Sequence, residues 1–164
     1  MKSKIQSSYR LSRLCKRLRK ARKKIVFTNG TFDLLHAGHI SYLEKAKTLG
    51  DVLIVGVNSD KSVKTYKGPS RPFVTEKDRL RVLSALECVD YVILFREPTP
   101  LKLITTLKPH VLVKGSDWAK SQIAGGREVL GWGGRVRRLP FLGGRSSSKI
   151  IERIQKAAAR KKRK

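Results

Sequence analysis

A strand that runs directly into a turn carrying two histidines is the feature that most constrains this chain. The apolar run at 25–27 leads into residues 29–39, which read Asn-Gly-Thr-Phe-Asp-Leu-Leu-His-Ala-Gly-His. His36 and His39 are three residues apart, a spacing that places both imidazoles on one face of a beginning helix. The N-terminus of a helix offers free backbone N–H groups and the positive end of its dipole to an anion. The junction therefore predicts a site that handles phosphate.

Two simpler interpretations of this junction explain less. A histidine pair at helical spacing is usually a surface feature, and a glycine after a strand is usually only a turn. Neither accounts for the whole eleven-residue cluster. Zinc is disfavoured because metal-binding helices commonly use His-x-x-x-His, and neither a cysteine nor a suitably spaced carboxylate completes a ligand set. We expect no metal ion held by the protein itself.

The distribution of apolar residues predicts the fold class. Apolar stretches that favour strands alternate with helical stretches, which indicates a parallel sheet covered on both faces. We therefore expect a doubly wound, Rossmann-like α/β domain, in which ligands bind at the carboxyl ends of the strands. The histidine motif falls at such an end. The expected strands lie at about 25–29, 52–57, 90–95, 111–114 and 135–139.

The net charge of +26 is concentrated at the two ends of the chain. Residues 1–24 hold eleven Lys and Arg and no acid, and residues 156–164 hold six more and no acid. The remaining excess in 25–155 suits a domain that binds polyphosphates. We therefore divide the chain into a basic N-terminal extension (1–24), a central catalytic domain (25–155) and a basic C-terminal tail (156–164). The tails suit nucleic acid or an anionic surface as a partner.

Leucines at helical spacing suggest that the N-terminal extension has structure. Leu11, Leu14 and Leu18 predict an amphipathic helix that docks on the core or on an anionic surface. No continuous apolar segment follows the basic residues, so we expect neither a secretion signal nor a membrane span. The two isolated cysteines, Cys15 and Cys88, are typical of a reducing compartment. These observations favour a cytoplasmic enzyme.

The segment 58–79 is basic, is interrupted by glycine and proline, and lacks a sustained apolar period. We interpret it as a mobile active-site loop that leads into a helix. A basic loop is more often simply solvated, but cations near a bound polyphosphate neutralise the charge on its oxygens. The cations of this segment are Lys61, Lys64, Lys67, Arg71, Lys77 and Arg79.

The histidine motif resembles a known signature. Residues 30–33, Gly-Thr-Phe-Asp, followed by 36–39, His-Ala-Gly-His, are similar to the signature of the cytidylyltransferase-like nucleotidyltransferases. Members of that family join a nucleoside triphosphate to a phosphorylated substrate and release pyrophosphate. The closer resemblance is to the adenylyltransferase domain of ADP-heptose synthases, which act on D-glycero-β-D-manno-heptose 1-phosphate. It also covers residues 57–60, 67–72, 79–86, 112–118, 123–125 and 144–151.

The resemblance implies roles for individual residues. His36, His39, Lys67 and Arg79 would be catalytic, with the histidines acting as hydrogen-bond donors to the transition state. The residues implied in nucleotide binding are Thr31, Phe32, Asp33, Gly38, His39, Lys114, Gly115, Asp117, Ser146, Ser147 and Ser148. Those implied in binding the second substrate are Asn58, Asp60, Lys64 and Arg71.

The serines have a second interpretation, as helix caps, and Lys114 has one as a surface charge. The branch that uses CTP usually carries Arg-Thr-x-Gly-Ile-Ser-Thr-Thr near these serines. This chain has Phe-Leu-Gly-Gly-Arg at 141–145 ahead of them, which weighs against CTP. Heptose relatives often carry Gly-Asp-Tyr where this chain has Ser-Asp-Trp at 116–118.

The resemblance implies a direct in-line displacement on the α-phosphorus of ATP, with Mg²⁺ carried by the triphosphate. It also implies a homodimer, and a separate kinase that supplies the heptose 1-phosphate. Sister reactions stay open: CTP with glycerol 3-phosphate or phosphoethanolamine, and ATP with flavin mononucleotide. Two interpretations of the charged ends also stay open. The chain could be a nucleic-acid-binding protein built on a transferase fold, or an enzyme whose extensions hold it to an acidic partner or membrane.

Overall fold

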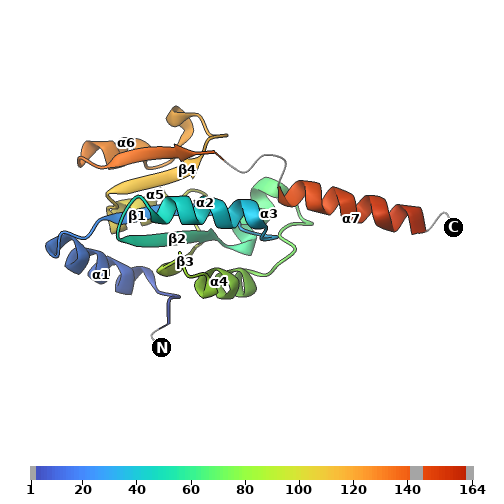
Figure 1. The fold of residues 1–164 in the computed structure, drawn as a ribbon, viewed down its shortest axis with the longest axis horizontal. Helices are drawn as coiled ribbons and strands as arrows, with labels where there is room; N and C mark the ends of the chain where they lie inside the picture. The colour runs from blue at the N-terminus through green and yellow to red at the C-terminus, as the bar shows by residue number, and fades with distance from the viewer. Residues whose placement is uncertain (1–2, 141–145, 162–164) are drawn as a thin grey trace.

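The computed structural model describes residues 3–140 and 146–161. Its centre is a sheet of five parallel strands in the order β3-β2-β1-β4-β5 (Figure 1). All five strands fall at the predicted stretches, to within one or two residues at their ends. Their bounds are β1 Ile25–Gly30, β2 Val52–Asn58, β3 Tyr91–Phe95, β4 Val111–Gly115 and β5 Arg135–Leu139.

Helices cover both faces of the sheet, which confirms the doubly wound α/β prediction. Alternate residues of β1 point to opposite faces, so Ile25 and Phe27 join one buried cluster while Val26 joins the other. α2 (Ala37–Lys47) and α4 (Glu76–Ala85) pack on the face of Val26. The opposite face is covered by α1 (Ser8–Lys20), α5 (Leu101–Leu107) and α6 (Gly126–Gly131), and the short 3₁₀ helix η1 (Lys120–Gln122) precedes α6.

The basic N-terminal stretch is packed into this fold. In α1, Leu11 and Cys15 are fully buried against the sheet and α5, and the cationic residues other than the half-buried Arg19 are exposed. Just before α1, the chain runs along β3: the Gln6 N–H donates to the Val92 carbonyl and the Val92 N–H donates to the Lys4 carbonyl, both at 2.9 Å. The sequence predicted that this amphipathic helix docks on the core or on an anionic surface, and in the structure it packs on the core.

The segment 58–79 is not one continuous loop. α3 (Asp60–Lys67) follows β2 almost immediately, and only residues 68–75 form the connection to α4. The Ser59 hydroxyl caps α3 by accepting from the Ser62 N–H, and Val63 is fully buried. Gly68 ends the helix at a φ of +92°, a backbone conformation that favours glycine. The expectation of a mobile loop is therefore corrected for its first half.

The chain ends in a long helix, α7 (Ser147–Lys161), which extends away from the sheet in Figure 1. The Ser146 hydroxyl accepts from the Lys149 N–H at 3.2 Å, so this serine caps the helix as expected. Residues 141–145, which include part of the matched 144–151 segment, and residues 162–164 of the basic tail lie outside the described residues. Within the described residues, no helix is both long and apolar enough to cross a membrane.

Candidate active site

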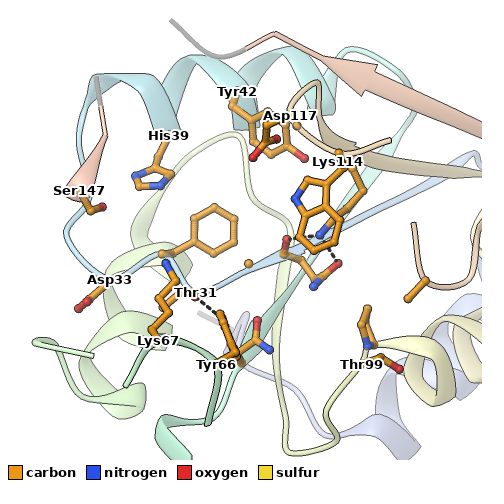
Figure 2. Close-up of a pocket in the computed structure, with 18 of the residues that line it drawn as sticks. Thr31, Asp33, His39, Tyr42, Tyr66, Lys67, Thr99, Lys114, Asp117 and Ser147 are labelled. Atoms are coloured by element: carbon orange, nitrogen blue, oxygen red, sulfur yellow. Dashed lines mark hydrogen bonds between the residues drawn. The ribbon is translucent and has the colours of Figure 1, made fainter. Parts of the chain in front are cut away.

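The carboxyl ends of β1, β2 and β4 open into a cavity of about 610 Å³. β1 lies between the other two strands, at the point where the chain order of the sheet reverses, which is where ligands bind in doubly wound sheets. Figure 2 shows side chains from several elements converging on this space. The lining residues are Asn29, Gly30, Thr31, Phe32, Asp33, His39, Tyr42, Asn58, Tyr66, Lys67, Pro98, Thr99, Pro100, Lys114, Gly115, Asp117, Trp118, Gln122, Ala124 and Ser147.

The two histidines of the motif lie at the start of α2 but have different surroundings. His36 is the N-cap of α2, with an extended backbone, and its Nδ1 accepts from the Gly38 N–H at 3.1 Å. His39 lies in the first turn of the helix and lines the cavity. The two rings stack, with centroids 4.0 Å apart and planes 25° apart. The imidazoles therefore lie next to each other, as their spacing predicted, but His36 is not among the residues that line the cavity.

His39 enters the cavity as a neutral ring. Burial, together with the nearby charges of His36 and Lys67, lowers the pKa of His39 to about 4. The edge of the ring meets Phe32, with centroids 5.5 Å apart. Its Nδ1 is buried and has no hydrogen-bond partner among the described residues. The imidazole is thus positioned by packing, which leaves ring nitrogen capacity for a ligand.

Asp33 ties the connection 68–75 to the motif. Its carboxylate accepts from the Phe73 N–H at 2.9 and 3.1 Å and from the Val74 N–H at 2.9 Å, and it pairs with Arg71 at 2.7 Å. Arg71, expected at the second substrate, does not line the cavity, and its side chain is 12% exposed. Asp33 does line the cavity, but its oxygens are already engaged by the loop.

Arg79 is not at the cavity surface, contrary to the prediction that it contacts phosphate. Its side chain is fully buried and donates to the carbonyls of Val74, Thr31 and Asn58 at 3.0, 2.5 and 2.8 Å. It also pairs with Asp60 at 2.6 Å. Arg79 therefore joins the ends of β1 and β2 to α4 behind the cavity wall, and it acts as a positioning residue.

Asp60 also serves the fold at this point. Besides accepting from Arg79, its second oxygen accepts from the Glu76 N–H at 3.1 Å, while the Asp60 N–H donates to the Glu76 carboxylate at 2.8 Å. This reciprocal pair connects the beginnings of α3 and α4. The predicted substrate contact of Asp60 is thus replaced by an internal one, whereas Asn58 does line the cavity, with its Nδ2 donating to Ser62.

The two lysines predicted on the basic segment separate in the structure. Lys67, at the end of α3, lines the cavity, and Figure 2 shows its ammonium group directed into it. Burial lowers the pKa of Lys67, the Arg71 charge lowers it further, and Asp33 partly opposes both effects. Lys64 lies one helical turn earlier, is exposed, and does not line the cavity.

The end of β4 supplies a second cation. Lys114 donates to the side-chain oxygen of Asn29 at 3.2 Å, and its ammonium group lies 4.8 Å from the centre of the Trp118 ring. Burial lowers the pKa of Lys114 to about 8, an effect that Asp117 opposes. Gly115 and Asp117 line the same wall, as the prediction for this stretch required.

Of the three predicted serines, the structure brings Ser147 to the cavity. Its hydroxyl donates to the Leu34 carbonyl at 2.8 Å, which joins the start of α7 to the histidine motif. Ser146 caps α7 and Ser148 is exposed, and neither lines the cavity. Figure 2 shows Ser147 at the same end of the cavity as His39.

Sequence reasoning missed several lining residues. Tyr66, one residue before Lys67, shares a hydrogen bond of 2.5 Å with Thr31, and burial raises the pKa of its hydroxyl. The turn 98–100, Pro-Thr-Pro, follows the carboxyl end of β3 and closes another side. Its place immediately after a predicted strand was a signal that we did not use, because the turn carries no charged or nucleophilic side chain.

No group of three or more His, Cys, Asp and Glu side chains within 3–140 and 146–161 is placed to hold a metal ion. The lining carboxylates are Asp33 and Asp117, and Asp33 is occupied by the 68–75 connection.

Comparisons with known proteins place this geometry in a family. The family model described as "Cytidylyltransferase-like" matches residues 27–153. The "Bifunctional protein HldE" of Pelobacter propionicus is 54% identical over 132 residues, which are 80% of this chain and 27% of that protein. The protein of the same name from Trichlorobacter lovleyi is 50% identical over 152 residues, 93% of this chain and 31% of that protein. The chain thus spans less than a third of the length of these curated relatives.

Solved structures agree with this assignment. A lipopolysaccharide core biosynthesis protein from Thermoplasma volcanium is 30% identical with a TM-score of 0.60, and the match covers 73% of this chain and 97% of that one. A pantoate-beta-alanine ligase from Francisella tularensis has a TM-score of 0.61 at 20% identity, covering 88% of this chain and 68% of that one, which shows a shared fold alone. The chain belongs to the cytidylyltransferase-like family and is a nucleotidyltransferase.

Proposed function

We propose that the protein transfers the adenylyl group of ATP to D-glycero-β-D-manno-heptose 1-phosphate, giving ADP-heptose and pyrophosphate. The observation that carries the reaction class is the neutral His39 beside Lys67 and Ser147, at one end of the cavity whose other end holds Lys114. Hydrogen-bond donors and cations that are fixed before the reaction stabilise charge developing on phosphate oxygens.

The chemistry needs little from a general base. A phosphate oxygen of the sugar phosphate attacks the α-phosphorus of ATP, a new P–O bond forms, and the bond to the β-phosphate breaks. Pyrophosphate leaves with that electron pair. Because a phosphate monoester is already anionic near neutral pH, positioning and charge stabilisation supply most of the acceleration. His39 donates a hydrogen bond from its N–H to a phosphate oxygen, while Lys67 and Lys114 balance the negative charge.

The donor set fits a magnesium ion that arrives on the triphosphate. Mg²⁺ keeps several waters and commonly binds through substrate phosphates with one or two carboxylates. Here Asp33 is held by the loop, and Asp117 is the other lining carboxylate. The triphosphate oxygens would hold the ion, with Asp117 near enough to the cavity to contact its water shell. When bound, Mg²⁺ neutralises phosphate charge and draws the triphosphate into one conformation.

The sugar phosphate is proposed from the relatives. Two relatives at 50–54% identity are named bifunctional proteins HldE, and the similar solved structure is described as a lipopolysaccharide core biosynthesis protein. This chain matches about a third or less of those relatives. The match includes the cavity-lining residues on β1, α2, α3 and β4, which supports the same class of substrates for this chain.

Pyrophosphate release is the direct test. ATP and CTP, each with Mg²⁺, are combined with the heptose 1-phosphate, glycerol 3-phosphate and flavin mononucleotide. We expect release only from ATP with the heptose phosphate. Release from another pair would retain the reaction class and reject the substrate, and no release from any pair would reject both.

Two lysines on one helix provide a matched pair for the site. Lys67→Met removes a cation from the cavity and Lys64→Met removes one from the exposed side of α3. We expect the first to lower kcat/KM by at least 10²-fold and the second to leave it within about twofold. Equal effects would show that the lysines act through long-range charge and not through contact. His39→Asn is expected to lower kcat by about 10²–10³-fold with a smaller effect on nucleotide binding.

A further inference from the structure

A second recess lies at the opposite ends of the strands from the active site. It has a volume of about 370 Å³ and is formed where β1, β4 and β5 begin, beneath the last turn of α2. Each strand residue advances about 3.3 Å, so the six residues of β1 separate the recess from the active site by about 20 Å. The lining residues are Lys24, Thr48, Leu49, His110, Val111, Gly133, Arg135 and Arg137.

The recess is lined by three cationic side chains, and the nearby carboxylate that interacts with Lys24, that of Asp51, is not one of the lining residues. Lys24 comes from the start of β1, and Arg135 and Arg137 project from the same face of β5 because they are two residues apart. Among the described residues, none of these three side chains forms a hydrogen bond or an ion pair. No Asp or Glu lines the recess. Three like charges held near one another without a partner repel each other, and an anion between them would relieve that repulsion.

The nearest carboxylate is already engaged. Asp51, at the turn before β2, accepts from the Lys24 N–H at 2.7 Å and pairs with Lys23 at 3.3 Å. Arg19 adds a further positive charge close to this end of the sheet, where it donates to the carbonyls of Leu107 and Lys108. The surroundings of the recess therefore add to its positive potential.

His110 supplies a directed donor in addition to the charges. The Ile25 N–H donates to His110 Nδ1 at 2.9 Å, so this nitrogen is unprotonated and the ring proton lies on Nε2. Burial lowers the pKa of His110, and the charges of Arg19 and Lys24 lower it further, while the charge of Asp51 partly opposes them. Guanidinium groups, an ammonium group and an imidazole N–H together match the oxygens of a phosphate.

We infer that this recess is a binding site for a phosphate group, separate from the nucleotidyltransferase cavity. The two sources of such a group are free phosphate and the backbone of a nucleic acid. The wider basic surface, with Arg19 beside the recess, suits either one. Arg135 and Arg137 carry most of the affinity because they lie on one face of an exposed edge strand and form planar, paired hydrogen bonds with phosphate oxygens.

Amide NMR of the ¹⁵N-labelled full chain tests the site. The protein is titrated with inorganic phosphate, with single-stranded oligouridylate in a parallel experiment, at constant ionic strength maintained with chloride. Residue-resolved shifts separate this recess from the catalytic cavity. We expect saturable shifts at Lys24, Gly133 and Arg135 with at least one of the two ligands. Saturation with inorganic phosphate assigns a free phosphate, and saturation with the oligonucleotide alone assigns a nucleic-acid backbone.

Variants of equal charge identify the site. Arg135→Gln/Arg137→Gln is expected to raise the dissociation constant at the recess at least tenfold. The control Lys77→Gln/Arg81→Gln removes the same charge from α4, which packs on β2 and β3, near the opposite edge of the sheet from β5. It is expected to change the constant less than twofold. Shifts that stay linear with both ligands, or equal losses in both double variants, would overturn the inference.

Discussion

The buried guanidinium of Arg79 offers the sharpest test of how this site is built. The side chain is fully buried and gives its hydrogen bonds to three main-chain carbonyls and one carboxylate, from four separate places in the chain. Arg79→Met keeps much of the length of the stem and removes all of the donors. The perturbation therefore isolates the polar connections from the packing of the side chain.

The expected cost follows from the groups left behind. A buried acceptor that loses its partner costs about 1–3 kcal/mol, and removing one member of a buried ion pair costs about 3–5 kcal/mol. These values do not add fully, because the side chain of Asp60 is 31% exposed and recovers water. We expect Arg79→Met to lower the free energy of unfolding by about 4–5 kcal/mol. That is a large part of the 5–15 kcal/mol typical of a domain.

Urea unfolding followed by circular dichroism measures this loss through the transition midpoint. The control is Arg81→Met, two residues further along the same helix, where the side chain is exposed and the expected change is within about 0.5 kcal/mol. A loss below about 2 kcal/mol for Arg79→Met would refute the buried network. If activity fell sharply while stability stayed normal, Arg79 would instead contact the substrate, as its sequence context had suggested.

Three further predictions concern ionisation and backbone geometry. His39 has a folded pKa of about 4, below the usual 6.5, so the stability that its neutral form contributes is complete above pH 6.5 and is lost as the pH falls toward 4. After discounting for partial exposure, His39→Gln should reduce the loss of unfolding free energy between pH 7 and 4.5 by about 2 kcal/mol. Urea unfolding at both pH values measures this loss, and an unchanged loss would contradict the assigned pKa. The Lys114 pKa of about 8 means that its positive charge is lost at higher pH. We therefore expect kcat/KM for ATP to fall from pH 8 to 9.5 in the native enzyme and to fall less in Lys114→Arg. Parallel pH profiles would show that Lys114 does not cause the decrease. Gly125 and Gly133 both have a φ near +80°, but a Cβ at Gly125 would lie 2.7 Å from Ile104, whereas one at Gly133 would have no atom within 4 Å. Gly125→Ala should therefore lower the free energy of unfolding by about 2 kcal/mol more than Gly133→Ala. Thermal or urea unfolding measures the difference, and equal losses would mean that backbone strain alone decides the effect.

The sheet and the location of the cavity were predictable because both depend on long-range patterns. Apolar runs of strand length followed by glycine-bearing turns identify the carboxyl ends of β1 and β4, and parallel strands bring those ends to one edge. The motif on β1 and the Lys114 stretch on β4 therefore met as expected. Hydrophobic patterning repeats over many residues, so local exceptions do not obscure it.

The direction of individual cations was not predictable in the same way. Lys64, Lys67 and Arg79 are alike in charge and lie within sixteen positions, yet one is exposed, one lines the cavity and one is fully buried. The burial of each side chain depends on how α3 and α4 are rotated about their axes. α3 has only eight residues, and its position is set by the Ser59 cap and by Val63, a pattern too short for a hydrophobic period to reveal.

In the N-terminal stretch, the apolar pattern was more informative than the charge. Its density of Lys and Arg suggested an addition to the domain, but the few apolar positions at helical spacing decide where it lies. Leu11 and Cys15 are fully buried, and burial raises the pKa of the Cys15 thiol to about 11, which leaves it an unreactive packing group at neutral pH.

The segment that runs along β3 also bears on how copies of this protein behave together. An uncovered sheet edge is a template on which another chain can add a strand, which leads to aggregation. Residues 4–6 occupy the outer edge of β3. The other edge strand, β5, carries Arg135, Arg137 and Arg138, whose charges oppose edge-to-edge pairing with a second copy. A shortened chain beginning at residue 8 would keep every residue of the active site and yet expose a bare apolar edge. Its solubility, rather than its chemistry, would be the property lost first.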